Sequence, residues 1–171
     1  DIETTELPVT KVWMIGTMNE AGEVRNFLFP FNKEEIQAWF DQYEEVIGHN
    51  FIDFDAVHLE NIVGVSLAGL KVTDTLILSK LYNPQLEGGH SLRAWGDRLH
   101  FPKGKHVDFD KLTPEMVEYC TQDLKVTKKV YDVLTDKLAS FGDTSIHLEH
   151  EVQKIITKQI QNGWELDQRK C

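Results

Sequence analysis

The chain has 171 residues, 41% of them hydrophobic and 27% charged, and its formal net charge is −10 at pH 7. This composition fits a globular domain with one sizeable core, and no apolar run approaches the roughly 20 residues that span a bilayer. Two cysteines, Cys120 and Cys171, give no disulfide framework, which favours a reducing, cytoplasmic setting. The acidic balance argues against broad non-specific nucleic-acid binding, yet it is compatible with an acidic site that reaches phosphate through bound metal.

The first segments predict an antiparallel meander followed by a helix. A short strand ends near Glu3, a β-rich run covers 9–18, and a further strand covers 24–29 after a turn. Asn32 and Glu35 then have the spacing of a capping box, and apolar residues follow at helical intervals.

Shorter elements alternate through the middle of the chain. The pattern predicts a strand at 46–48, a helix over 55–63, a strand at 70–73, and helices over 75–81 and 90–99. This alternation predicts an α/β protein.

Two longer helices fill the last third. Thr113 and Pro114 are typical of a helix start, and the apolar stripe continues to about residue 140. Tyr119 and Asp123 lie four residues apart and so project from one side of this helix, which we place on the flank of its apolar stripe. A second helix is expected from Thr144 to about residue 163, with a domain boundary near 142.

Acidic residues recur in three separate segments. Asp1 and Glu3 share one strand face, Asp55 follows the strand at 46–48, and Asp123 lies on the long helix. Four carboxylates in one pocket would repel each other unless divalent cations lay between them, and oxygen ligands favour Mg²⁺ or Mn²⁺. Each acid by itself is better explained by a solvated or capping role, and only the occurrence of all three segments in order favours a shared site. Spacing does not decide between Asp53 and Asp55.

Two further groups have ordinary explanations. Lys103, Lys105 and His106 form a basic loop that is either a phosphate contact or simply mobile. His147 and His150 lie three residues apart, but zinc sites need more ligands, so a solvated helix face is expected.

These segments resemble the three exonuclease motifs of the DEDD superfamily of 3′–5′ exonucleases, in its tyrosine subgroup. The motifs correspond to residues 1–5 (DIETT), to His49-Asn50 with Asp55, and to Tyr119 with Asp123. The fuller resemblance is to the proofreading domain of family A DNA polymerases of the short-tailed phage replicative type. It is carried by the segments TDTL at 73–76, HSLRAWG at 90–96, and HE through KQIQNG to Asp167 at 150–167.

The resemblance implies a ribonuclease-H-like fold: a mixed sheet with its first three strands antiparallel, flanked by helices. It implies an exonuclease domain over 1–142 and the truncated start of a polymerase domain over 143–171. The start on a candidate ligand without Met predicts that the chain is part of a longer protein.

The resemblance also implies roles for five residues. Asp1, Glu3 and Asp123 would ligate the inner of two Mg²⁺ or Mn²⁺ ions, and Asp55 would hold the outer one. Tyr119 would orient the attacking water.

Four more residues are implied to contact the substrate. Leu7 would wedge against the terminal base, while Thr4 and Thr5 would contact the 3′-terminal nucleotide. Asn50 would order its turn or contact DNA.

The activity implied is two-metal hydrolysis of the 3′-terminal phosphodiester of single-stranded DNA, with release of 5′-mononucleotides. The expected partners are a single-stranded 3′ end and a polymerase domain of the same chain, with no membrane, in bacterial or phage-infected host cytoplasm. Two alternatives stay open: an exoribonuclease of the same superfamily and a non-catalytic interaction domain.

Overall fold

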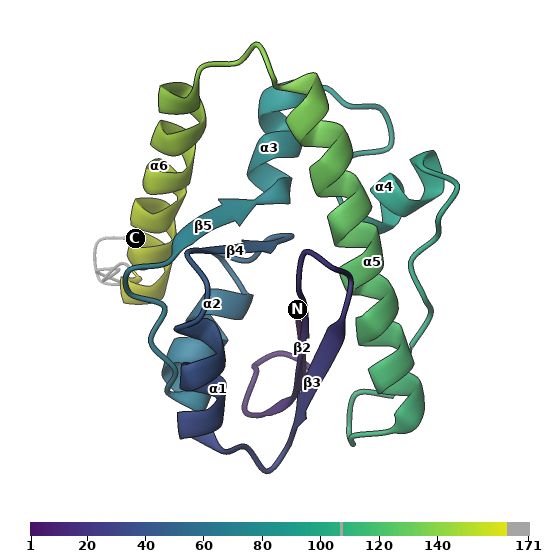
Figure 1. Ribbon diagram of the computed structural model, residues 1–171, viewed down its shortest axis with the longest axis vertical. Coiled ribbons are helices and arrows are strands. Elements are labelled where there is room, and N and C mark those ends of the chain that lie inside the picture. Colours follow the sequence, from purple (N-terminus) through teal and green to yellow (C-terminus); the bar gives the residue numbers. More distant parts are fainter. Residues whose placement is uncertain (107, 164–171) are drawn as a thin grey trace, which may run out of the picture.

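Five strands and seven helical segments make up the computed structural model, which describes residues 1–106 and 108–163 (Figure 1). Asp167 and its neighbours lie outside the described residues. The strands are β1 (Ile2–Thr4), β2 (Val12–Met18), β3 (Val24–Leu28), β4 (Glu45–Gly48) and β5 (Lys71–Asp74). The helices are α1 (Lys33–Phe40), α2 (Asp55–His58) with its π-helical continuation η1 (Leu59–Val63), α3 (Thr75–Tyr82), α4 (Leu92–Arg98), α5 (Pro114–Lys137) and α6 (Asp143–Asn162).

The first three strands form the expected antiparallel sheet, in the order β1-β2-β3. Ile2 pairs with Ile15 and Glu3 with Met14, and β2 continues the register into β3 through Met14 and Leu28. Because side chains alternate along a strand, Ile2 and Glu3 point to opposite faces of this sheet. The sheet therefore buries an apolar side chain on one face and presents an acid on the other.

The remaining strands, β4 and β5, pair in parallel, with Gly48 opposite Asp74. A parallel pair requires a crossover, and the helical residues 55–63 supply part of it. Both strands end at the same edge, where α/β proteins commonly bind ligands. The chain is thus an α/β protein with a three-stranded antiparallel and a two-stranded parallel sheet flanked by helices, which is compatible with a ribonuclease-H-like fold.

Side-chain caps begin the helices where the sequence predicts them. The Asn32 side chain accepts a hydrogen bond from the Glu35 amide, 3.1 Å away, at the start of α1. The Glu35 carboxylate pairs with Arg25 at 2.5 Å. Thr113 Oγ1 accepts from the Met116 amide at the start of α5. Satisfying amides that have no partner within the helix stabilises each start by about 1 kcal/mol.

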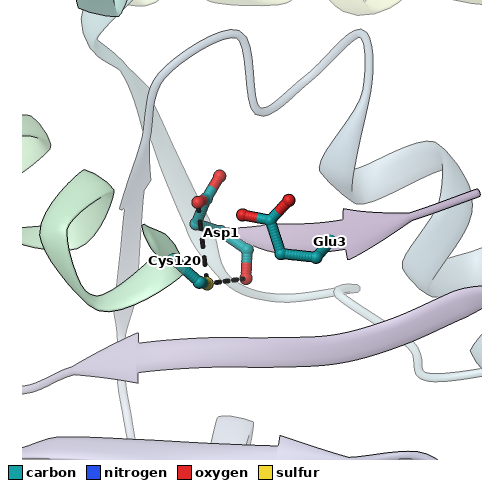
Figure 2. A group of neighbouring side chains, drawn as sticks. All are labelled: Asp1, Glu3 and Cys120. Carbon is teal, nitrogen blue, oxygen red and sulfur yellow. Dashed lines mark hydrogen bonds between the residues drawn. The ribbon is translucent and has the colours of Figure 1, made fainter. Parts of the chain in front are cut away.

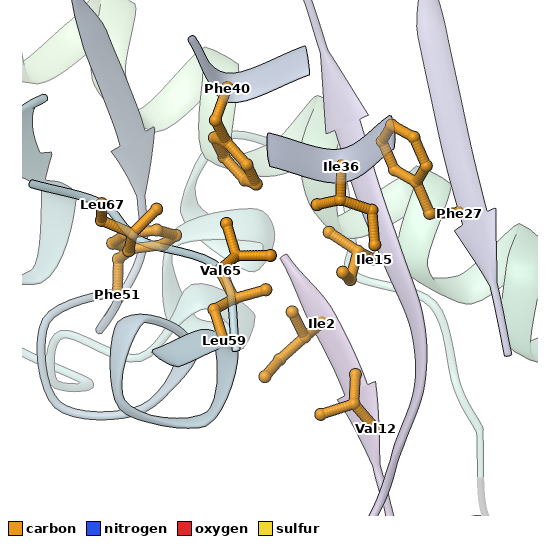
Figure 3. Close-up of a cluster of buried hydrophobic side chains, with 10 residues drawn as sticks. All are labelled: Ile2, Val12, Ile15, Phe27, Ile36, Phe40, Phe51, Leu59, Val65 and Leu67. Atoms are coloured by element: carbon orange, nitrogen blue, oxygen red, sulfur yellow. The ribbon is translucent and has the colours of Figure 1, made fainter. Parts of the chain in front are cut away.

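The main core lies between α1, β1, β2 and the segment around η1 (Figure 3). Its ten buried members are Ile2, Val12, Ile15, Phe27, Ile36, Phe40, Phe51, Leu59, Val65 and Leu67. These residues lie far apart in the sequence, so the core joins the antiparallel sheet to the segment that carries Asp55. It fixes β1, which carries Glu3, relative to the segment of Asp55.

The long helix α5 packs along β2, and more lightly against β1 and β4, on one side and against α3 and α4 further along. Close approach to β2 depends on Gly16, since a Cβ there would lie 2.6 Å from Cys120 Sγ. This contact places the helix directly over the strand next to β1. Asp123 is thereby brought toward Glu3.

The last helix, α6, is joined to the parallel sheet by buried polar contacts. His150 is 4% exposed, and its Nε2 accepts a hydrogen bond from the Asp74 amide at 2.8 Å. Gln153 and Thr157 donate hydrogen bonds to the carboxylate of Asp53. The expectation that His150 lies on a solvated face is wrong, because that face of α6 packs against β5.

Candidate active site

The first two acids lie together at the start of the chain. Asp1 precedes β1 and its carbonyl accepts a hydrogen bond from the Gly16 amide, which ties it to β2. Figure 2 shows the carboxylates of Asp1 and Glu3 side by side, next to the thiol of Cys120. One potential ligand atom from each of these three residues lies within 4.8 Å of the other two. Glu3 is only 5% exposed.

Cys120 is an unsuitable ligand in this group. Its Sγ lies 3.7 Å from Asp1 Oδ2, but burial raises the pKa of the thiol to about 12. Metals bind the thiolate rather than the thiol, so Cys120 packs against the site as a neutral side chain. The two carboxylates remain as the metal-binding candidates.

The second segment resolves the choice between Asp53 and Asp55. Asp55 is 3% exposed and faces the first acids, with its Oδ1 3.9 Å from the backbone nitrogen of Asp1. Asp53 is exposed and hydrogen-bonded to α6. Only Asp55 therefore joins Asp1 and Glu3.

A neighbouring carboxylate shapes the turn that leads to Asp55. Asp74, at the end of β5, accepts hydrogen bonds from the amides of Asn50 at 2.9 Å and Ile52 at 3.1 Å. Asn50 has a left-handed φ of 60°, a conformation that asparagine tolerates better than most residues. The backbone of Asn50 thus forms part of the turn, while a contact of its side chain with DNA stays a prediction.

His49 is held as a neutral side chain. Its Nδ1 lies 2.9 Å from Thr75 Oγ1, which itself donates to the Gly48 carbonyl, so the imidazole is the donor in this pair. Burial and the charge of Lys103 lower the pKa of His49 to about 4. This contact gives His49 a structural rather than a metal-binding role.

The third segment contributes from α5. Asp123 is 1% exposed, whereas Tyr119, one turn earlier, is half-buried. The buried face of this helix runs through Met116, Cys120 and Thr127 with Asp123 inside it. The expectation that Asp123 lies on the flank of the apolar stripe is therefore wrong. Successive buried residues of α5 are three or four positions apart, and Asp123 is one of them.

Lys103 joins the acids from the loop before α5. Its Nζ lies 2.5 Å from Asp123 Oδ2 and 4.8 Å from the centre of the Tyr119 ring. Burial alone would lower the pKa of Lys103, but Asp123 and Tyr119 raise it above its ordinary value. A charged ammonium thus lies inside the carboxylate site.

The pKa values of the three buried acids are raised mainly by burial. Burial, reinforced by the charge of Asp123, raises the pKa of Glu3 to about 8. Burial also raises the pKa of Asp55 to about 6 and raises that of Asp123. Positive charge placed among these acids would lower their pKa values again and let all of them ionise together.

Unpaired oxygens indicate how such charge would fit. Oδ1 of Asp55 and Oδ1 of Asp123 are buried without a hydrogen-bond partner in the described part of the chain. Buried polar atoms are normally satisfied, and exceptions often mark an ion or functional site. The donor set of carboxylate oxygens suits Mg²⁺ or Mn²⁺, so the residues present fit the expected cofactor.

A hollow of about 600 Å³ opens beside Glu3. It is lined by Ile2, Glu3, Thr4, Thr5, Glu6, Leu7, Val9, Phe54 and Phe109. Leu7 is 80% exposed, while Thr4 is buried. Three of the four expected substrate contacts, Thr4, Thr5 and Leu7, thus line one cavity of ligand-binding size. Asn50 is absent from this lining as far as the described residues show.

Two parts of this arrangement were missed by sequence reasoning. The basic loop was noted, but the pairing of Lys103 with Asp123 was not expected. Phe54 and Phe109 were not considered as cavity walls. The only available signal was a lysine beside a glycine shortly before the third acidic segment.

The fold and site together define an α/β protein with a buried cluster of acids contributed by three segments. No family model matches the sequence. The chain is similar to the DNA-directed DNA polymerase of Escherichia phage T7, with 27% identity over an alignment of 146 residues that covers 55% of this chain and 21% of that protein. The alignment thus spans about a fifth of that protein's length. This similarity relates the chain to a DNA polymerase. No helix in the described part of the chain has the length and apolar character needed to cross a membrane.

Proposed function

We propose that the chain is the metal-dependent 3′–5′ exonuclease unit of a DNA-directed DNA polymerase. It hydrolyses the 3′-terminal phosphodiester of single-stranded DNA and releases 5′-mononucleotides. The observation that carries this proposal is the convergence of Glu3, Asp55 and Asp123, buried acids from three segments with raised pKa values. Similarity to a DNA polymerase supports the choice of substrate.

Asp1, Glu3, Asp55 and Asp123 would hold the divalent ions. When bound, Mg²⁺ or Mn²⁺ would supply the positive charge that keeps these acids ionised, activates water and neutralises the leaving oxygen. The chain contributes a rigid frame for the ligands, because β1, the Asp74-braced turn and α5 are each held by backbone contacts.

Tyr119 is the candidate for orienting the attacking water. Burial raises the pKa of its phenol above the ordinary value, despite the opposing charge of Lys103. The phenol therefore stays protonated at neutral pH and acts as a hydrogen-bonding group. A water held by Tyr119 next to Asp123 would face the cluster of acids.

The hollow beside Glu3 offers a place for the terminal nucleotide. Its wall combines apolar side chains, Phe54, Phe109 and exposed Leu7, with the polar segment at Thr4 and Thr5. Base faces stack well on aromatic surfaces without regard to sequence. Such a wall suits a site that accepts any frayed 3′ end.

The activity is tested with a 5′-labelled single-stranded DNA oligonucleotide in Mg²⁺. The protein should shorten it one nucleotide at a time from the 3′ end, and Asp123→Asn should reduce the rate by about a thousandfold, as loss of a key electrostatic group does. Asp132→Asn is the matched control, because Asp132 lies exposed on the same helix and pairs with Lys128. Equal rates for the two variants would disprove the assignment.

The two alternatives give different outcomes in related assays. An exoribonuclease would degrade a matched RNA oligonucleotide faster than the DNA one. A non-catalytic interaction domain would bind no divalent ion in the micromolar-to-millimolar range by calorimetry. The buried oxygens of Asp55 and Asp123 that lack a hydrogen-bond partner within the described residues favour a working metal site over a vestigial one.

A further inference from the structure

Lys103 places a positive charge beside two of the buried acids, Asp123 and Glu3. Its ammonium is 2.5 Å from Asp123 Oδ2, and its charge also lowers the pKa of Glu3 against the effect of burial. The side chain is 21% exposed, so it reaches the acids from the solvent side. Burying an unpaired carboxylate is costly, and this ammonium offsets that cost.

The same position conflicts with metal binding. Mg²⁺ binds carboxylate oxygens at about 2.0–2.1 Å, closer than the ammonium lies to Asp123. A divalent ion on Asp123 would therefore be a near neighbour of Nζ, and would repel it twice as strongly as a single charge would at that distance. An ion on Oδ1 of Asp123, which has no hydrogen-bond partner in the described part of the chain, would leave Lys103 on Oδ2 as its near neighbour, so the two cations oppose each other.

The surrounding contacts indicate which part of Lys103 can move. The Pro102 carbonyl accepts a hydrogen bond from Gln122 of α5 at 2.9 Å. A Cβ on Gly104 would lie 3.1 Å from the Tyr119 ring, so the backbone on both sides is held against α5. Only the flexible four-carbon stem of Lys103 is free to withdraw toward solvent.

We propose that Lys103 is an internal cation that competes with divalent ions for Asp123. This inference rests on the proposed function, since it concerns regulation of the same site. The ammonium stabilises the cluster of acids when no ion is bound, and its repulsion of an ion on Asp123 drives it to withdraw when one binds. Lys103 thereby weakens metal binding and protects the acids from mutual repulsion.

The test is calorimetric titration with Mg²⁺ at pH 9, where the Glu3 carboxyl, with its pKa of about 8, is largely ionised. Lys103→Met should bind Mg²⁺ about tenfold more tightly than the wild-type protein, because the positive charge that repels the ion is removed. Lys105→Met is the control, since Lys105 is exposed two residues along the same loop and changes net charge equally. Equal or weaker binding by Lys103→Met than by Lys105→Met would overturn the inference.

A second measurement needs no variant. Acetylation of lysines, followed by mass spectrometry, should show Lys103 becoming more reactive on addition of Mg²⁺ while Lys105 stays unchanged. Unchanged or lower reactivity of Lys103 would contradict its withdrawal.

Nucleotide release measured on the same samples separates the two proposals. Metal binding and hydrolysis without any effect of Lys103→Met on affinity would refute only the competition. Absence of Mg²⁺ binding in the wild-type protein and in both variants would refute the metal site and the competition together. Binding seen only in Lys103→Met would support the competition.

Discussion

The amide of Asp74 donates a hydrogen bond to Nε2 of His150, 2.8 Å away, across the contact between β5 and α6. The carboxylate of the same aspartate accepts hydrogen bonds from Asn50 and Ile52, in the turn before Asp55. The last described helix is thereby linked through one residue to the segment that positions a candidate metal ligand.

His150→Ala should lower the free energy of unfolding by about 1–3 kcal/mol, because the Asp74 amide would lose a buried partner. His147→Ala should change it by less than about 0.5 kcal/mol, since His147 is exposed on the same helix. Urea unfolding of the two variants tests this. Equal stabilities would show that the hydrogen bond to Asp74 contributes nothing.

The order and type of the elements could be predicted from the sequence because they depend on local patterns. Caps such as Asn32 and Thr113, and the periodicity of apolar residues, determine where helices begin and which side is buried. The spacing of Tyr119 and Asp123 likewise places both on neighbouring turns of α5. These features need no knowledge of the tertiary structure.

Other features could not be predicted, because they depend on which elements pack together. Asp53 and Asp55 have similar local surroundings in sequence. They differ in the structure because Asp53 is hydrogen-bonded to α6, whereas Asp55 faces the site. The burial of His150 and the pairing of Lys103 with Asp123 join positions 76 and 20 residues apart. No local spacing rule specifies either contact.

Glu3→Gln should make stability less dependent on pH. The pKa of Glu3 is raised from 4.5 to about 8 in the folded protein, so between these values the folded state holds a proton that the unfolded state has released. Stability from this group is therefore fully present below pH 4.5 and is lost as pH rises toward 8. The measurement is the unfolding free energy of Glu3→Gln minus that of the wild-type protein, with a chelator present. This difference should be larger at pH 9 than at pH 5, by up to about a few kcal/mol. A difference independent of pH would contradict a buried, crowded Glu3.

Tyr119→Phe should reduce nucleotide release by about ten- to a hundredfold, as expected when a group that orients a reactant is lost. Mg²⁺ affinity should change little, because the phenol is not one of the proposed ligands. Calorimetry and the oligonucleotide assay on one preparation measure both quantities. Full activity in the variant would exclude Tyr119 from orienting the water.

Gly16→Ala should destabilise the protein by about 1–3 kcal/mol, since its new Cβ would lie 2.6 Å from Cys120 Sγ. Combining it with Cys120→Ala, which removes that sulfur, should recover part of the loss. Thermal or urea unfolding of the two single variants and the double variant gives the unfolding free energies for a double-mutant cycle. Strictly additive effects would mean that the approach of α5 to β2 is not limited by this contact.

The most direct test of the central claim is anomalous diffraction from a crystal soaked in Mn²⁺ with a short single-stranded oligonucleotide. We expect manganese peaks bound by Asp1, Glu3, Asp55 and Asp123, with the 3′-terminal phosphate beside them. Manganese located elsewhere, with these four acids free of metal, would contradict it.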